Sequence, residues 1–499
     1  MLDTVLTDSA TSLVTRKQSL FYSDISRVIT RTSMPGGTDR VLRVCERITQ
    51  LSPQRAAECY ERVRAAFEDR HRDITEEFRR NYYIAMRNLP GGADLDMNQL
   101  SPEHRILMGA YFTKEFSIEA AAFFNPSIVP HPDQSGMDDD SSRVLLSFRA
   151  VGEGHLSSIV FRSGVVDGNN DLTLDPLSRY VETPEVVRNP NYIKQTFCLK
   201  LDEMEVHDEV RDEILDDLPE EFTFKDLEDA IWIYGVHHPE RSEHPTINTI
   251  KWVAKANYEL IFSSDYDVSE RVIFPYSDNE SSGIEDARFV RFVDDDGEVV
   301  YYATYTAFNG TTILPQMLET RDFVRFKIIT LNGSAVKNKG MALFPRKLDG
   351  QYYMVGRIDG ENLYLMNSEN LHFWHQAKLL VRPRYDWDLI TIGNCGSPIE
   401  TSEGWLLLTH GVGPMRTYSL GAVLLDLEDP SIVRAYMKKP LMVAEGKERE
   451  GYVPNVVYTC GYMRHNDSVL LPYAMSDTVA GFAVVDLEGL LNRLLDDAD

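Results

Sequence analysis

The chain has 499 residues, 43% of them hydrophobic, which suits two structural units or one large β domain with additions. Its formal net charge of −27 repels nucleic-acid backbones and anionic lipid, so an anionic substrate would need a local basic pocket. The five cysteines are widely spaced and form no Cys-x-x-Cys pair, which argues against a disulfide framework and a zinc ribbon. The start lacks a signal-peptide pattern and no apolar run is long enough to span a membrane, so the sequence predicts a cytoplasmic protein.

The first 120 residues carry the pattern of helices. The stretch SPQRAAECYERVRAAFEDRHRDITEEFRRNYYIAMRNL has apolar residues at helical spacing among many charges. Ser52 followed by Pro53 is a helix start signal. We therefore predict an N-terminal helical region over residues 1–120.

From about residue 121 short β-rich runs alternate with turn signals. Five passages share a plan of strand, turn, strand, loop and strand, and from the second unit onward they recur every 50–60 residues or so. Their second strands lie at 144–154, 300–310, 352–360, 405–413 and 469–477. This pattern predicts a five-bladed β-propeller over residues 121–490. An irregular β-sandwich is the alternative.

One long segment interrupts the repeats, between the first and second units. Residues from about 170 to 265 read as largely helical and predict an insertion off the propeller rim. Together with the N-terminal helices, this insertion could form a cap or a surface for a homo-oligomer.

Matching positions in propeller blades surround the same central space. The second strands end on polar residues, namely Arg149, Thr306, Arg357, His410 and Asp477. Five polar residues in register indicate a polar site at the axis, although solvated strand ends would give the same pattern.

Several motifs occur in a characteristic order along the β region. They are GIEDARF (283–289), NKGMALFP (338–345), WDLITIGNCGSPI (387–399), GWLLLTHGV (404–412), GYVPNVVYTCG (451–461) and LPYAMSD (471–477). In this order, from about Asn125 to about Leu487, they resemble glycoside hydrolase family 130. That family contains β-mannoside phosphorylases and β-mannosidases on a five-bladed propeller. The N-terminal helices and the insertion lie outside the resemblance.

The resemblance implies an inverting reaction on a β-manno-oligosaccharide or a mannosyl glycoside. A carboxylic acid protonates the glycosidic oxygen, by way of the sugar's own 3-hydroxyl. In the phosphorylases inorganic phosphate then attacks and gives α-mannose 1-phosphate, whereas in the hydrolases water attacks with the help of a carboxylate base. No metal and no cofactor other than phosphate as co-substrate is implied. A non-catalytic sugar-binding propeller is a second alternative, and the linkage stays open.

Asp286 falls on the family's catalytic acid. In an extended strand its neighbour Glu285 would point to the opposite side, so we expect only one of the two carboxylates to face the axis. Arg288 would return to the Asp286 side and orient it. The chain departs from the family at Ala287, where a proline is usual.

The resemblance also implies a phosphate pocket. Lys339, Arg357 and His410 fall on phosphate-binding positions of the phosphorylases. Gly340 replaces an amide and Thr391 replaces a lysine of that pattern. The β-mannosidases have glutamates at the arginine and lysine positions, and this chain has neither. A basic pocket in so acidic a protein favours phosphorolysis.

Further residues fall on the sugar-binding positions of the family. They are Arg149, Arg162, Asp477, Tyr418 and Tyr458. The histidines of HHPERSEH (237–244) fit no standard zinc spacing, so no metal site is predicted.

Overall fold

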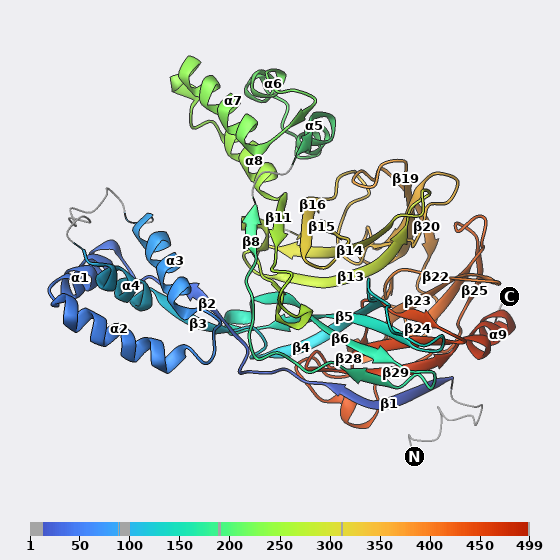
Figure 1. The fold of residues 1–499 in the computed structure, drawn as a ribbon. Coiled ribbons are helices and arrows are strands. Elements are labelled where there is room, and N and C mark those ends of the chain that lie inside the picture. Colours follow the sequence, from blue (N-terminus) through green and yellow to red (C-terminus); the bar gives the residue numbers. More distant parts are fainter. Residues whose placement is uncertain (1–12, 88, 90–99, 188–190, 311–312, 498–499) are drawn as a thin grey trace.

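The computed structural model describes residues 13–87, 89, 100–187, 191–310 and 313–497. Antiparallel sheets form the main body, and two groups of helices stand off it (Figure 1). The fold is therefore mainly β with N-terminal helices, as predicted. Within the described ranges, no helix combines the length and apolarity needed to cross a membrane.

Five sheets follow one another along the chain, and we number them one to five in that order. Sheet one consists of β4 (Ala122–Pro130), β5 (Ser142–Val151), β6 (Ser157–Val166), β7 (Leu172–Leu174) and β12 (Val272–Ile273). Sheet two consists of β13 (Ile284–Val293), β14 (Val299–Phe308), β15 (Ile313–Thr320), β16 (Arg325–Thr330), β11 (Tyr258–Ile261) and β8 (Glu185–Val187). Sheet three consists of β17 (Ala342–Leu343), β18 (Tyr352–Gly356), β19 (Leu363–Ser368) and β20 (Gln376–Val381).

The last two sheets complete the main body. Sheet four consists of β21 (Thr391–Asn394), β22 (Ile399–Thr401), β23 (Gly404–Val412), β24 (Tyr418–Leu425) and β25 (Val433–Tyr436). Sheet five consists of β26 (Val457–Tyr458), β27 (Met463–His465), β28 (Ser468–Met475), β29 (Val479–Asp486) and β1 (Val14–Phe21). Each predicted second strand is found, as β5, β14, β18, β23 and β28.

Apolar side chains pack each sheet against the next. Buried clusters join successive sheets, and a further cluster joins sheet five to sheet one through Phe482 and Phe148. This follows from the alternation of the strands, which places one apolar row on each face. The five-bladed propeller is the interpretation that we propose for these sheets.

The N-terminal region is only partly helical. Its helices are α1 (Thr38–Thr49), α2 (Pro53–Phe67), α3 (Ile74–Arg87) and α4 (Pro102–Tyr111). As predicted, α2 begins at Pro53, and the Ser52 side chain caps it by accepting from the Arg55 N–H. By contrast β1 pairs with β29 inside sheet five, and β2 (Val28–Thr32) pairs with β3 (Thr113–Ser117) to carry the helices away from the sheets (Figure 1). Residues 1–12, 88 and 90–99 of the predicted region lie outside the described residues.

The insertion is helical over a shorter range than predicted. It contains α5 (Lys194–Glu203), α6 (Glu209–Asp216), α7 (Phe224–His237), α8 (Pro245–Lys255), β9 (Tyr192–Ile193) and β10 (Glu221–Phe222). The helices share a buried apolar cluster of their own. They stand on β8 and β11, which extend the outer edge of sheet two (Figure 1). A last helix, α9 (Leu487–Asp497), packs on sheets four and five.

Candidate active site

Asp286 lies at a bulge near the start of β13. The pairing of β13 with β14 shifts register between Glu285 and Arg288, and Asp286 has φ 57°, in the left-handed region that a non-glycine residue seldom occupies. Asn125 lies at a corresponding register shift in β4 and has φ 49°. Its Nδ2 donates to Asp286 Oδ1 over 2.6 Å. Two strained segments from neighbouring sheets therefore fix the carboxyl group of Asp286.

The bulge also changes where Glu285 points. Arg149 Nη2 donates to Glu285 Oε1 over 2.9 Å, and Arg149 Nη1 lies 3.9 Å from Asp286 Oδ1. Glu285 Oε2 accepts from Lys339 Nζ over 2.7 Å. The expectation that only one of the two carboxylates faces the centre is therefore wrong, because the bulge breaks the alternation of the strand. Glu285 joins cations from sheet one and from the segment before sheet three.

The charges around Asp286 decide its protonation. Burial alone would raise the pKa of the Asp286 carboxyl, but Arg288 and Arg149, with the Asn125 hydrogen bond, outweigh burial and lower the pKa. Arg288 is buried, and its Nη1 donates to the Asp286 carbonyl oxygen over 2.9 Å. Its Nη2 donates to the Tyr458 hydroxyl. Arg288 thus orients the acid through the backbone, while Asp286 is ionised in the unliganded protein.

Arg357 and His410 meet over Gly393. A Cβ on Gly393 would lie 2.5 Å from His410 Cε1 and 2.7 Å from Arg357 Cδ, so only glycine leaves room for both. The Arg357 guanidinium has neither an ion pair nor a hydrogen bond within the described part of the chain, and its buried Nε is unpartnered there. Burial, with help from Arg357 and Arg288, holds the pKa of His410 well below its usual range, so the imidazole is neutral. The predicted phosphate pocket therefore contains two cations, and one of these, Lys339, is already paired with Glu285.

Two tyrosines enclose His410. The Tyr418 ring is nearly parallel to the imidazole at 6.0 Å between centroids, and the Tyr458 ring meets it edge-on at 4.9 Å. Both tyrosines thus lie beside a predicted phosphate ligand, and Tyr458 also accepts from Arg288 next to Asp286. Their rings leave His410 little freedom to move.

Asp477 approaches the same centre from sheet five. It follows β28 with φ 52°, and burial together with the charge of Asp286 raises the pKa of its carboxyl to about 6, against the opposing effect of Arg149. Two neighbouring carboxyl groups thus have pKa values displaced in opposite directions, which is typical of a site that holds and moves protons.

Several buried polar atoms around this centre have no partner among the described residues. They are Asn125 Oδ1, Arg149 Nε, Arg288 Nε, Arg357 Nε, Asn394 Oδ1 and His410 Nε2. Buried polar groups are nearly always hydrogen-bonded, so this concentration indicates a polar ligand. Donors and acceptors in such number suit sugar hydroxyls and an oxyanion.

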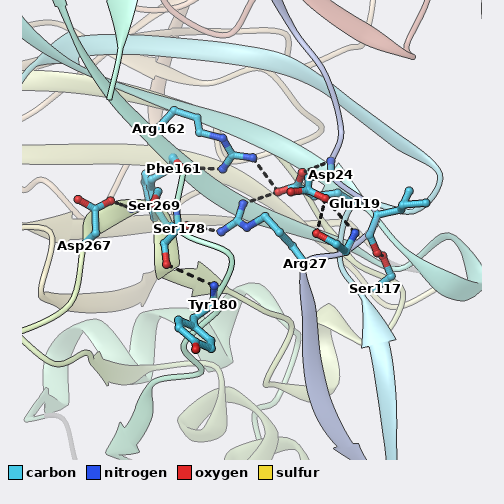
Figure 2. Close-up of polar contacts among 12 residues, drawn as sticks. Asp24, Arg27, Ser117, Glu119, Phe161, Arg162, Ser178, Tyr180, Asp267 and Ser269 are labelled. Atoms are coloured by element: carbon cyan, nitrogen blue, oxygen red, sulfur yellow. Dashed lines mark hydrogen bonds and ion pairs between the residues drawn. The ribbon is translucent and has the colours of Figure 1, made fainter. Parts of the chain in front are cut away.

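One expectation about the site does not fit the geometry. Arg162 is directed away from the centre: its Nη2 donates to Glu119 Oε1 over 2.9 Å, in a buried cluster that also includes Arg27 (Figure 2). The reason is that side chains alternate between the two faces along β6. Arg149 pairs with Ile159, and Arg162 lies three residues after Ile159, so its side chain is on the other face of sheet one. Thr391, at the family's lysine position, donates to the carbonyl oxygens of Gly360 and Glu361 and brings no charge.

Sequence reasoning missed Asn125 and the role of Glu285. Asn125 is a polar residue inside the apolar run AFFNPSIVP, directly before a proline, and this is the one signal that could have identified it. Nothing in the sequence around Glu285 reports the bulge that turns it toward Arg149.

Comparisons with known proteins identify the family. The sequence pattern of glycoside hydrolase family 130, described as β-1,4-mannooligosaccharide phosphorylase, matches residues 265–496. The chain is 34% identical to a 1,2-β-oligomannan phosphorylase of Thermoanaerobacter sp. (strain X514) over 48% of this chain and 81% of the relative. It is 27% identical to a β-1,2-mannobiose phosphorylase of Listeria innocua over 70% of this chain and 95% of the relative.

One similar solved structure is a β-1,2-mannobiose phosphorylase from Listeria innocua bound to β-1,2-mannobiose. Its TM-score is 0.45 at 21% identity, and the match covers 76% of this chain and 93% of that one. The sequence relatives and the family pattern decide the assignment. The chain belongs to glycoside hydrolase family 130 and is an enzyme of this family of β-mannoside phosphorylases.

Proposed function

We propose that the protein is an inverting phosphorylase that cleaves β-1,2-linked mannosides with inorganic phosphate and releases α-mannose 1-phosphate. Three curated relatives between 27% and 34% identical carry β-1,2-mannoside phosphorylase names, which supports this linkage. The pattern matched over residues 265–496 carries a β-1,4 description, so the linkage needs its own test.

The observation that carries phosphorolysis is the pair of Arg357 and His410 over Gly393. A guanidinium without a partner in the described residues and an unpartnered imidazole Nε2 suit the oxygens of a phosphate ion. No carboxylate occupies the position of Arg357 or Thr391 to activate water. Lys339 would add a third contact, in exchange for or in addition to its bond with Glu285.

Asp286 serves in this proposal as the acid that passes a proton to the leaving oxygen through the mannose 3-hydroxyl. In the overall reaction the glycosidic C–O bond breaks and a C–O bond to phosphate forms. The proton of hydrogen phosphate ends on the released hydroxyl, so the site needs no other proton source. A bound phosphate offsets the cations that lower the pKa of Asp286, and its protonated form becomes more populated.

Incubation with β-1,2-mannobiose and β-1,4-mannobiose, each with and without phosphate, tests the proposal. We expect α-mannose 1-phosphate only with phosphate and faster from the β-1,2 disaccharide. Mannose release without phosphate would instead indicate a β-mannosidase. In Asp286→Asn we expect at least a thousandfold lower turnover with sugar binding retained, since acid catalysis contributes roughly this much. Unchanged turnover would refute the assignment of the acid.

We also propose that the five sheets are the blades of a five-bladed propeller over residues 121–490, with the active site on its axis. Support comes from the packing of each sheet on the next and of sheet five on sheet one. The strand β1 adds an N-terminal strand to the last blade. The N-terminal helices and the insertion remain our candidates for an oligomer surface.

A further inference from the structure

A buried carboxylate lies in the turn that leads into the bulge of Asp286. Glu280 ends the one-turn helix Asp278–Glu280 and is 0% exposed. Its Oε2 accepts from the backbone N–H groups of Tyr276 and Ser277, both over 3.0 Å. The carboxylate therefore fixes the shape of the segment that enters β13.

Two tyrosines of sheet two hold the same carboxylate. From β14, the Tyr305 hydroxyl donates to Glu280 Oε1 over 2.7 Å, and from β11 the Tyr258 hydroxyl contacts both oxygens at 3.0 and 2.9 Å. Burial and the charge of Glu280 raise the pKa of each tyrosine well above its usual range, so both hydroxyls stay protonated and donate. These donors are hydroxyl and backbone N–H groups rather than cations, so the buried charge depends on each of the hydrogen bonds. We call Glu280 with these two tyrosines the Glu280 anchor.

Tyr305 lies opposite the bulge itself. The pairing of β13 with β14 places two residues of β13, Asp286 and Ala287, opposite Tyr305 alone. A strained backbone of this kind persists only where the surrounding structure holds it in place. The bond between Tyr305 and Glu280 therefore joins the turn before the bulge to the residue that faces the bulge.

Backbone contacts connect the Glu280 anchor to the start of β13. The Gly283 N–H donates to the Glu280 carbonyl oxygen over 2.7 Å, and the Phe308 N–H donates to the Gly283 carbonyl oxygen over 3.1 Å. From sheet one, Ser157 Oγ donates to the Ile284 carbonyl oxygen over 2.7 Å. A shift of the turn would therefore be transmitted directly to the bulge.

We propose that Glu280 is a positioning residue for the reaction. By holding the turn and Tyr305 together, it keeps Asp286 at φ 57° with its carboxyl group directed to the substrate. Glu280 is fully buried, so it acts through Asp286 and does not touch the substrate. This inference rests on the proposed role of Asp286 as the acid. Loss of the anchor should lower turnover rather than binding, because other residues hold the sugar and the phosphate.

Two variants and their combination test the anchor. In Glu280→Gln an amide N–H group must face either the tyrosine hydroxyls or the backbone N–H groups, so one side of the anchor loses its acceptor. We expect kcat with β-1,2-mannobiose and phosphate to fall about a hundredfold, as for a displaced catalytic group, with KM for both substrates within about twofold of the wild type. Tyr305→Phe removes one hydroxyl, keeps the ring and should lower kcat about tenfold. The double variant should have the kcat of Glu280→Gln, because both changes break the same bond, and fully additive losses would overturn the inference.

Tyr192→Phe is the matched control. The buried Tyr192 hydroxyl donates to the Ala254 carbonyl oxygen over 2.7 Å, within the apolar cluster of the insertion. We expect Tyr192→Phe and Tyr305→Phe to lower the unfolding temperature to a similar degree, while only Tyr305→Phe lowers kcat. A folded Tyr305→Phe protein with wild-type kcat, or with a raised KM in place of a lowered kcat, would overturn the inference. Should Glu280→Gln fail to fold, Tyr305→Phe decides.

The proposed function would fail in a different way. Turnover of the wild type without phosphate, or an active Asp286→Asn protein, would count against that function whatever the result at Glu280. An inactive Asp286→Asn protein beside an unimpaired Tyr305→Phe protein would keep Asp286 as the acid and overturn only the role of the anchor.

Discussion

Replacing Gly393 by alanine tests whether Arg357 and His410 form the phosphate site. The added Cβ would lie 2.5 Å from His410 Cε1 and 2.7 Å from Arg357 Cδ, whereas carbon atoms in contact stay about 3.5 Å apart. One of the two side chains must therefore withdraw by about 1 Å. His410 is held between Tyr418 and Tyr458, so Arg357, which is only partly buried, is the side chain that moves.

A displacement of this size at a reacting centre typically costs about a hundredfold in rate, or about 3 kcal/mol of transition-state stabilisation. We expect kcat/KM for phosphate to fall by about that factor in Gly393→Ala, while binding of β-1,2-mannobiose remains. Initial rates at varied phosphate concentration measure the first quantity, and calorimetry measures the second.

Stability needs its own control, because overpacking a buried site costs roughly 1–3 kcal/mol. Gly235→Ala, in helix α7, places its Cβ 3.8 Å from the Ser242 Cβ, an ordinary contact, and should leave activity unchanged. A folded Gly393→Ala protein with wild-type kcat/KM for phosphate would refute the placement of phosphate between Arg357 and His410.

Two further predictions concern the carboxylates of the site. In Glu285→Gln, Lys339 loses its counter-ion and becomes available to phosphate. We therefore expect the KM for phosphate to fall about fivefold, equivalent to about 1 kcal/mol. An unchanged or higher KM for phosphate would contradict this prediction. Asp477 has a pKa raised to about 6, so ionising it destabilises the folded state by up to about 3 kcal/mol at pH values above 6, and the penalty disappears as pH falls toward the unfolded value near 4. Asp477→Asn should therefore unfold at a higher temperature than the wild type at pH 8 but not at pH 4.5. Thermal denaturation at both pH values measures this, and a lower unfolding temperature of the variant at pH 8 would contradict the prediction.

The repeat pattern was informative because it depends on local chemistry. Alternating apolar residues and turn signals placed all five second strands correctly, and Ser52 with Pro53 marked the start of α2. The same reasoning failed for β1, which lies in the region that we predicted to be helical. In the structure β1 pairs with β29, more than 450 residues away along the chain. Local propensity carries no information about a partner so distant in sequence.

The sequence by itself determined the family and the positions of the five second strands, because the motifs and alternating runs that carry them are contiguous, and it led to Asp286 as the acid that we propose. Only the tertiary structure decided how the charges are shared at the site. A bulge at Asp286 turns Glu285 toward Arg149 and Lys339, burial keeps His410 neutral, and Glu119 engages Arg162 on the opposite face of its sheet. Each of these depends on which distant side chains meet at short distance and how much water is excluded between them, and a linear pattern does not specify either quantity.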